Sequence, residues 1–149
     1  SPYKEFNQGL KNLETGQTTQ AETALVEFVE AKPKNAEGWN QLGIIAFEQE
    51  EWDLARNCFR KAYALDRLHP AYPRNLALVY ANDKQYDLAE ELLDRSLAVD
   101  PLNTHSLIAL AKVKMLQEKN TEAELLLNRV RKIDPAHKEA QTLLTRLSK

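Results

Sequence analysis

The chain has 149 residues, of which 43% are hydrophobic and 28% are charged, with a formal net charge of −2. This composition is typical of a globular domain, and the slightly acidic balance argues against nucleic acid as a bulk electrostatic partner. The single cysteine, Cys58, excludes an intrachain disulfide.

A set of small and large apolar residues recurs every 34 positions along the chain. The set is clearest at Trp39, Leu42, Gly43, Ala55, Phe59 and Ala62. Prolines recur in step with this period at Pro33, Pro101 and Pro135, and Arg67 stands at the one position in between that lacks a proline. No insertion or deletion is needed to align the copies, and such a period is typical of solenoids. We therefore divide the chain into four repeats and a tail, at residues 2–35, 36–69, 70–103, 104–137 and 138–149.

Each repeat is predicted to form two helices joined by a short turn. In residues 36–69, the first helix follows Asn35, a residue type that caps helix N-termini. Ala55 and Phe59 share a face of the second helix, because residues four apart lie on one side of a helix. The second helices are expected to end at "LDR", "VDP" and "IDP". The sequence holds only four glycines and no Asn-Gly turn, so it gives no β-hairpin signal.

The tail is predicted to form a short helix that covers the last repeat. One apolar stripe runs along it, at Ala140, Leu143, Leu144 and Leu147. The side chains expected to face solvent are Gln141, Thr145 and Arg146. A solenoid needs such a cap because its last repeat has no following repeat to cover it.

Small residues at equivalent positions predict where helices cross closely. Gly43, Ala77 and Ala111 lie one period apart on the first helices. Helices of this length are marginal in water by themselves, so each repeat depends on packing against its neighbours. We expect the absence of a large side chain at these positions to let two backbones approach.

At these positions the sequence resembles the tetratricopeptide repeat family. The family pattern is W-x2-L-G-x2-Y, then A-x3-F, then P, within 34 residues. Residues 36–69 match it except at Ala46, where tyrosine is usual, and the first repeat departs most. The resemblance implies an all-α fold, a right-handed α–α superhelix of helix-turn-helix repeats forming a single domain over residues 2–137. It also implies a concave surface, lined by the first helices, that binds protein partners.

Thirteen residues of the first helices are predicted to line that partner-binding groove. They are Phe6, Asn7, Leu10, Asn40, Gln41, Ile44, Phe47, Arg74, Asn75, Leu78, Ile108, Lys112 and Met115. Within this set, Leu10, Ile44 and Leu78 form an apolar column, and Asn7, Gln41 and Asn75 form an amide column. An amide side chain both donates and accepts hydrogen bonds, so it can hold a peptide backbone. Two alternatives stay open: the apolar column packs in the core, or the amides are merely solvated.

Catalytic and metal-binding patterns are not recognisable in the sequence. It contains no Gly-rich phosphate loop, no G-x-S-x-G and no H-E-x-x-H. His69, His105 and His137 are spread over successive repeats, so we interpret them as solvated turn residues rather than ligands. Cys58 has no Cys or His at ligand spacing and is interpreted as a buried thiol. We expect no enzyme activity, no cofactor and no metal.

The sequence therefore predicts a non-catalytic scaffold that binds a peptide or a helix of a protein partner. The alternative is a structural module that self-associates through its ends into a homo-oligomer, because the first three repeats are acidic and residues 104–149 are basic. The family resemblance further suggests bacterial pilus biogenesis, secretion or envelope assembly. The longest apolar run, residues 42–47, is too short to insert into a membrane. Two compartments stay open: the cytoplasm, or the periplasm or a membrane-anchored state if an upstream signal has been removed.

Overall fold

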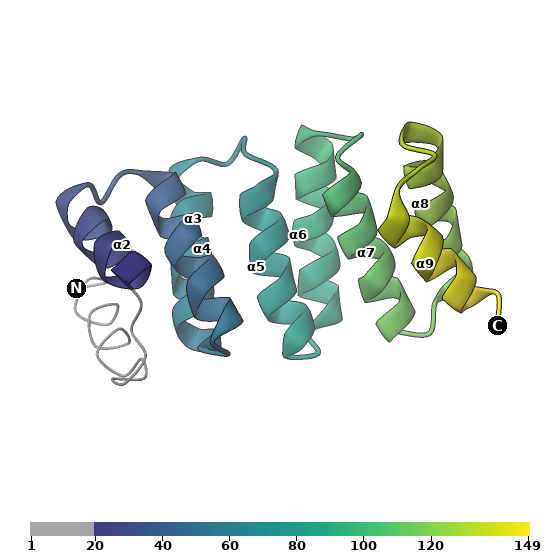
Figure 1. Cartoon of the computed structure of the whole chain (residues 1–149), viewed down its shortest axis with the longest axis horizontal. Coiled ribbons are helices and arrows are strands. Elements are labelled where there is room, and N and C mark those ends of the chain that lie inside the picture. Colours follow the sequence, from purple (N-terminus) through teal and green to yellow (C-terminus); the bar gives the residue numbers. More distant parts are fainter. Residues whose placement is uncertain (1–19) are drawn as a thin grey trace. The chain divides into compact units, whose positions relative to one another are not determined.

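The computed structural model describes residues 20–149, and every regular element in this range is an α-helix (Figure 1). The helices are α2 (Gln20–Ala31), α3 (Ala36–Glu48), α4 (Trp52–Leu65), α5 (Ala71–Asn82), α6 (Tyr86–Val99), α7 (Thr104–Leu116), α8 (Asn120–Ile133) and α9 (Lys138–Leu147). None of them has the length and apolar character that crossing a bilayer requires. The predicted groove residues Phe6, Asn7 and Leu10 lie outside the described residues.

The chain divides into two compact units between Arg67 and Leu68. In unit 1, α3 packs against both α2 and α4. In unit 2, each helix from α5 to α9 packs against the next, and α5 also contacts α7. Short turns join the successive helices of each unit, so the chain reverses direction at each one (Figure 1). Consecutive helices are thus antiparallel, as the helix-turn-helix repeats predict.

Asparagine side chains fix where α3 and α7 begin. The Oδ1 atom of Asn35 accepts a hydrogen bond of 3.0 Å from the backbone N–H of Gly38. Asn103 does the same for Ser106 of α7, also at 3.0 Å. These bonds satisfy N–H groups that have no partner within the helix. The prediction that Asn35 caps the first helix of its repeat is confirmed.

Three turns within repeats share one backbone conformation. Glu50, Lys84 and Glu118 follow α3, α5 and α7 with φ of 62°, 61° and 61°, in the left-handed region. After α3, the N–H of Glu51 donates to the carbonyl of Ala46, and that of Glu50 donates to Phe47. The same bond pattern follows α5 and α7. This pattern is the Schellman motif, which ends helices and usually places glycine at the left-handed residue. No residue pattern predicts this motif, because none of the three left-handed residues is glycine.

The predicted close crossing of helices is present at Gly43. A Cβ atom built on Gly43 would lie 2.6 Å from two ring carbons of Phe59, far inside van der Waals contact. Gly43 lies in α3 and Phe59 in α4, and both are buried. Ala77 and Ala111, at the equivalent positions of α5 and α7, are fully buried. The expectation that small residues lie at these helix contacts is therefore correct.

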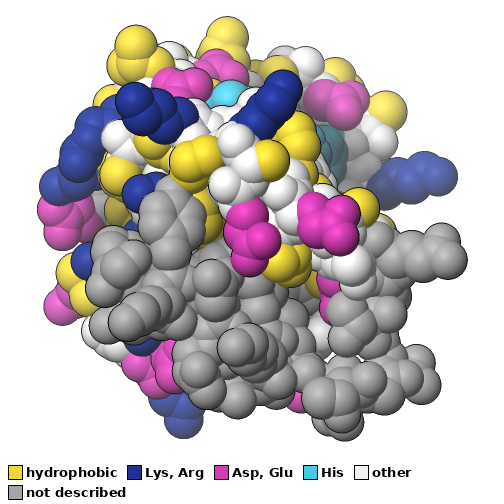
Figure 2. All heavy atoms as spheres, turned by 90° about the vertical axis from the view of Figure 1, so that its left-hand side faces the viewer, with side chains coloured by type: hydrophobic (Ala, Val, Ile, Leu, Met, Phe, Trp, Pro, Cys, Tyr) yellow, Lys and Arg dark blue, Asp and Glu magenta, His cyan; other side chains and the backbone are white. Residues whose placement is uncertain are grey.

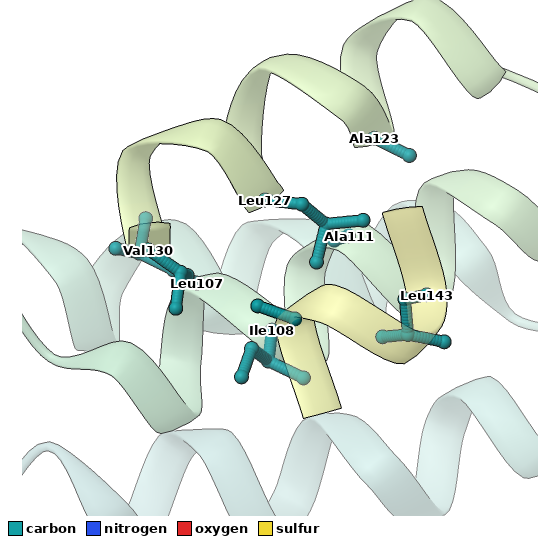
Figure 3. Packing of buried hydrophobic residues seen from close by; sticks show 8 residues of the cluster. Leu107, Ile108, Ala111, Ala123, Leu127, Val130 and Leu143 are labelled. Atoms are coloured by element: carbon teal, nitrogen blue, oxygen red, sulfur yellow. The ribbon is translucent and has the colours of Figure 1, made fainter. Parts of the chain in front are cut away.

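The core at the C-terminal end of unit 2 joins α7, α8 and α9 (Figure 3). Ala140 and Leu143 of α9 belong to the same buried cluster as Ala111, Leu127 and their neighbours. The apolar stripe of α9 is completed by Leu144 and Leu147, which pack against this cluster. The opposite face holds Gln141, Thr145 and Arg146, all exposed. The tail therefore forms the predicted helix and covers the last repeat.

Candidate functional site

Four of the predicted groove residues lie on α3 of unit 1. Asn40 is buried, with only 4% of its surface exposed, whereas Ile44 and Phe47 are half-buried. The ring of Phe47 packs edge-on against Trp52 at 5.1 Å between centroids. Gln41 is exposed, and its Nε2 donates a hydrogen bond of 2.5 Å to Glu37. Ile44 and Gln41 are thus reachable from solvent, while the Asn40 side chain is not.

Arg74, Asn75 and Leu78 lie half-buried on α5 of unit 2. One guanidinium nitrogen of Arg74, Nη1, donates to the Oδ1 atom of Asn103 at 3.4 Å. Burial lowers the pKa of Arg74 from its usual value, since a buried cation loses hydration. The cation is therefore held at the start of α7 by the residue that caps that helix. Sequence analysis missed this role of Asn103.

The three predicted residues of α7 are covered to different degrees. Ile108 is 4% exposed and lies in the core cluster with Leu143 of α9. Met115 is half-buried and packs against that cluster. Lys112 is about half exposed and forms an ion pair with Glu139 of α9. The side chains of α9 therefore occupy space that the sequence analysis assigned to a partner at this end of the unit.

Glu139 was missed because the tail was treated only as a cap. It lies 34 residues after His105, so the repeat period assigns it the same place in its helix. Extending that period into the tail would have made α9 the first helix of a further repeat, with Glu139 in its first turn. The binding role of the predicted residues on α3, α5 and α7 stays a prediction.

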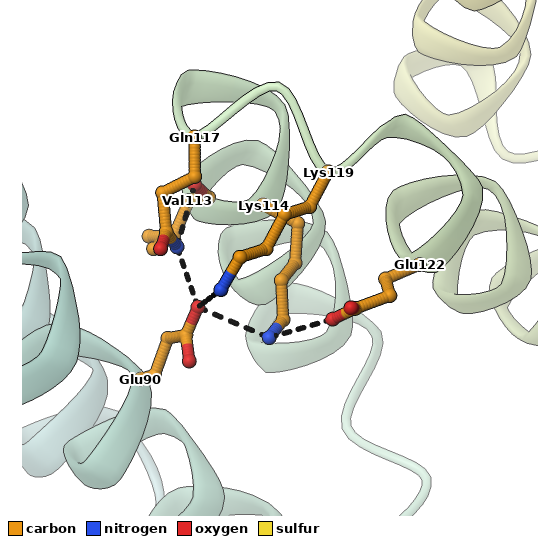
Figure 4. Close-up of polar contacts among 6 residues, drawn as sticks. All are labelled: Glu90, Val113, Lys114, Gln117, Lys119 and Glu122. Atoms are coloured by element: carbon orange, nitrogen blue, oxygen red, sulfur yellow. Dashed lines mark hydrogen bonds and ion pairs between the residues drawn. The ribbon is translucent and has the colours of Figure 1, made fainter.

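A network of charged and amide side chains links α6, α7 and α8 beside this core (Figure 4). Glu90 pairs with Lys114 at 3.0 Å and accepts a hydrogen bond of 2.5 Å from Nε2 of Gln117. Lys114 also pairs with Glu122 at 2.8 Å, and Lys119 lies 4.0 Å from Glu90. Burial would raise the pKa of Glu90, but the bonds from Gln117 and Lys114 outweigh it and leave the pKa below its usual value. The network ties α6 to the end of α7 and to the start of α8.

His69, His137 and Cys58 each take part in packing or hydrogen bonding within the fold. Nδ1 of His137 accepts a bond of 3.3 Å from the N–H of Ala140, at the start of α9. The ring of His69 stacks on Tyr72 at 4.2 Å between centroids. The thiol of Cys58 is fully buried, and burial raises its pKa, which disfavours the thiolate. Among the described residues, no cluster of three or more His, Cys, Asp and Glu side chains could hold a metal ion.

Sequence profiles of the tetratricopeptide repeat family match most of the chain. One matches residues 6–73 and again residues 40–104, and a second matches residues 80–147. A comparison with curated protein sequences finds no match. The family assignment therefore depends on these profiles and on solved structures.

Solved structures of tetratricopeptide repeat domains are similar to this chain. The first such domain of Spaghetti (RPAP3), solved bound to the HSP90 peptide SRMEEVD, is 26% identical with a TM-score of 0.72, over 76% of this chain and 92% of that chain. A structure of the first domain of human RPAP3 is also 26% identical, with a TM-score of 0.73, over 78% and 91%. MamA is 19% identical, with a TM-score of 0.75 over 93% and 81%, a likeness of fold alone.

The profile matches, the helix-turn-helix order and the structural neighbours agree with one another. They confirm the fold class as an all-α tetratricopeptide repeat solenoid. This chain belongs to the tetratricopeptide repeat family.

Proposed function

We propose that this protein is a non-catalytic scaffold that binds an extended peptide or a helix of a protein partner along its first helices. The observation that carries the proposal is the likeness to an RPAP3 domain that was solved with a peptide bound. Family members are typically interaction modules, and the charge balance of the chain disfavours nucleic acid. The proposed partner is therefore a protein or peptide, neither a nucleic acid nor a bilayer.

In unit 2, the proposed contact surface is the half-buried set on α5, namely Arg74, Asn75 and Leu78. Leu78 would accept an apolar side chain of the partner. The amide of Asn75 already interacts within the protein, so it would have to exchange that interaction for a bond to the partner's backbone. Arg74 adds a cation whose position is set by its hydrogen bond to Asn103. This combination favours a partner segment that carries an apolar side chain near a carboxylate or a backbone carbonyl.

In unit 1, the accessible residues of α3 offer a similar combination. Ile44 is half-buried, and Gln41 is exposed one turn before it. The amide of Gln41 already donates to Glu37, so a partner would have to replace that bond. Replacing a hydrogen bond between exposed groups costs little, because water competes for both of them in the free protein.

The test is a substitution on α5 with a matched control outside it. Peptides selected from a random library on the wild-type protein serve as the probe. Leu78→Glu should weaken their binding roughly tenfold or more, since a carboxylate would replace the apolar contact. Leu102→Glu is the control, because Leu102 is 67% exposed in the turn before α7. Circular dichroism checks that both variants keep the helical content of the wild type.

Equal binding by both folded variants would refute the α5 surface as the binding site. If Leu78→Glu unfolds the protein, Leu78 belongs to the core, and Leu78→Ala then tests binding with a smaller change. The setting implied by the family resemblance is bacterial pilus, secretion or envelope assembly. For that setting we expect the partner captured from native cells, and identified by mass, to be a component of such an assembly. A partner from another process would refute this setting and leave the binding role standing.

A further inference from the structure

The exposed faces of α6 and α8 carry opposite charges at nearby positions. On α6, Asp87, Glu91 and Asp94 are exposed and lie at i, i+4 and i+7, which is one side of a helix. We call these three residues the acidic ridge. One repeat later, α8 carries no acid at the equivalent positions. Instead its C-terminal half exposes Arg129 and Lys132, at i and i+3 on one side of the helix, and we call these two cations the basic ridge.

Most of these charges have no partner of opposite sign within the part of the chain that the structure describes. Glu91 pairs with Arg95 at 2.8 Å on the same helix. Asp87 and Asp94 form no ion pair, and neither does any cation of the basic ridge, with residues 20–149. By contrast, the neighbouring Glu90 is held by Lys114. Both ridges therefore have charge available for a partner.

The surroundings of Asp94 favour an additional cation. Burial raises the pKa of Asp94, and the nearby carboxylate of Glu90 raises it further. Lys114 offsets this only in part, because it is already shared between Glu90 and Glu122. A cation brought to Asp94 from outside would stabilise its charged form.

The arrangement of α6 and α8 makes this face complementary to itself. Both helices pack on α7, which lies between them along the unit (Figure 1). They run in the same direction, because the chain reverses once at each of the two turns that join them through α7. A two-fold axis that lies in the plane of this face, perpendicular to the line joining the centres of the two ridges, lays each ridge on the opposite ridge of a second copy. Interfaces of this kind, with one patch used twice, are the usual basis of symmetric dimers.

We propose that unit 2 binds a second copy of this chain through this face, with the acidic ridge of each copy on the basic ridge of the other. Leu88 and Leu125 would add apolar contact at the centre, since they are 42% and 64% exposed on the same two helices. The interface would thus combine uncompensated charge with apolar side chains that are open to solvent. It pairs the copies side by side, and not through the ends of the chain.

The face drawn in Figure 2 differs from the α6–α8 face in how its charged side chains are distributed. In its described part, Lys, Arg, Asp and Glu side chains lie interspersed with hydrophobic ones. Mixed signs at short range give a weak field, whereas a net excess of one sign on each of two neighbouring helices gives a directed one. This difference favours the α6–α8 face as the site of charge-driven pairing.

Sedimentation of the whole chain tests the proposal. At low ionic strength the wild type should form a dimer, and about 0.5 M NaCl should weaken that dimer roughly tenfold or more, because exposed charges are screened. Asp87→Lys/Asp94→Lys makes both ridges basic, and Arg129→Glu/Lys132→Glu makes both acidic. Each variant alone should remain a monomer, and an equimolar mixture of the two should form a one-to-one dimer.

The matched control is Arg146→Glu/Lys149→Glu, which changes net charge equally but acts at the end of α9. It should dimerise like the wild type, and circular dichroism should show unchanged helicity for every variant. A wild type that stays monomeric at low salt overturns the proposal, and so does a mixture of the two ridge variants that stays monomeric. Binding of the wild-type monomer to vesicles containing phosphatidylserine, lost in Arg129→Glu/Lys132→Glu, would assign the basic ridge to a membrane instead.

Discussion

Two helix pairs at equivalent places in their repeats solve one packing problem in different ways. In unit 1, α3 carries Gly43, and the ring of Phe59 from α4 lies where a Cβ would stand. In unit 2, α7 carries Ala111, and the corresponding residue of α8 is Leu127, in the same buried cluster (Figure 3). In each pair, a small residue on the first helix lies opposite a large residue on the second helix.

The difference shows that the volume of the pair is held constant while its members change. Glycine leaves room for an aromatic ring, and alanine leaves room for leucine only. Protein interiors are packed as densely as organic crystals, so one extra methyl group on one helix must be matched by a loss on the other. The repeat therefore specifies a pair of residues, and neither position is independent of the other.

Removing the large member of each pair should have the largest effect. Phe59→Ala is expected to cost about 3–5 kcal/mol of unfolding free energy, and Leu127→Ala about 2–5 kcal/mol. Phe59→Ala should be the more costly of the two, because Gly43 has no side chain that could fill part of the cavity. Urea unfolding followed by circular dichroism measures both. Leu116→Ala, at a 59% exposed position of α7, should change stability by less than about 0.5 kcal/mol.

Enlarging the small residue of a pair should have an intermediate effect on the free energy of unfolding. In Gly43→Ala, the new Cβ would lie 2.6 Å from ring carbons of Phe59, which is 2% exposed and has little room to move. Overpacking costs about 1–3 kcal/mol, and the higher helix propensity of alanine returns up to about 1 kcal/mol. We expect a net loss of stability by urea unfolding. A gain would mean that the Gly43–Phe59 pair is looser than its geometry indicates.

Two controls sharpen this test. Gly38→Ala lies on the same helix, and its Cβ would meet the ring of Phe28 at 2.7 Å, but that ring is 36% exposed and can swing outward. Its cost should therefore be smaller than that of Gly43→Ala. The double variant Gly43→Ala/Phe59→Leu recreates the unit 2 pair and should recover part of the lost stability. Additive effects of the two substitutions would refute the idea of a paired volume.

The period of 34 predicted most of the fold, because every feature that recurs in each repeat must recur at that spacing. It placed the crossing at Gly43, the cap at Asn35 and the ends of the second helices without any knowledge of packing. It did not predict the left-handed turn residues, because Glu50 and its equivalents are not the glycine that usually marks them. A backbone conformation adopted against residue preference is determined by the helices on either side, which no local pattern reveals.

The candidate site was harder to predict than the fold, for a similar reason. The repeat period assigned Ile108 and Lys112 to the groove, but it did not predict that side chains of α9 would contact them. Whether a residue on a helix face is open depends on the element packed against that face. Arg74 is held by Asn103, a residue 29 positions away to which the sequence analysis assigned no role. Such contacts depend on the distance between helices, which the repeat period does not fix.

The smallest expected effect concerns a feature that the two helix pairs share. The turn between α3 and α4 holds Glu50 at φ 62°, and the turn between α7 and α8 holds Glu118 at φ 61°. A residue with a side chain is strained there by about 1 kcal/mol or more, and glycine is not, although glycine gains entropy in the unfolded chain. Glu50→Gly and Glu118→Gly should each stabilise the protein by up to about 1 kcal/mol in urea unfolding.

Because both residues are exposed and neither forms an ion pair with the described residues, the substitutions remove strain and little else. The two gains should therefore be equal within error, even though the pairs on either side differ in volume. Exposed Glu124→Gly, in the interior of α8, is the control and should destabilise by roughly 0.5–1 kcal/mol. Unequal gains at Glu50 and Glu118 would mean that the packing of each pair strains its own turn, so that turn and crossing cannot be treated as separate features of the repeat.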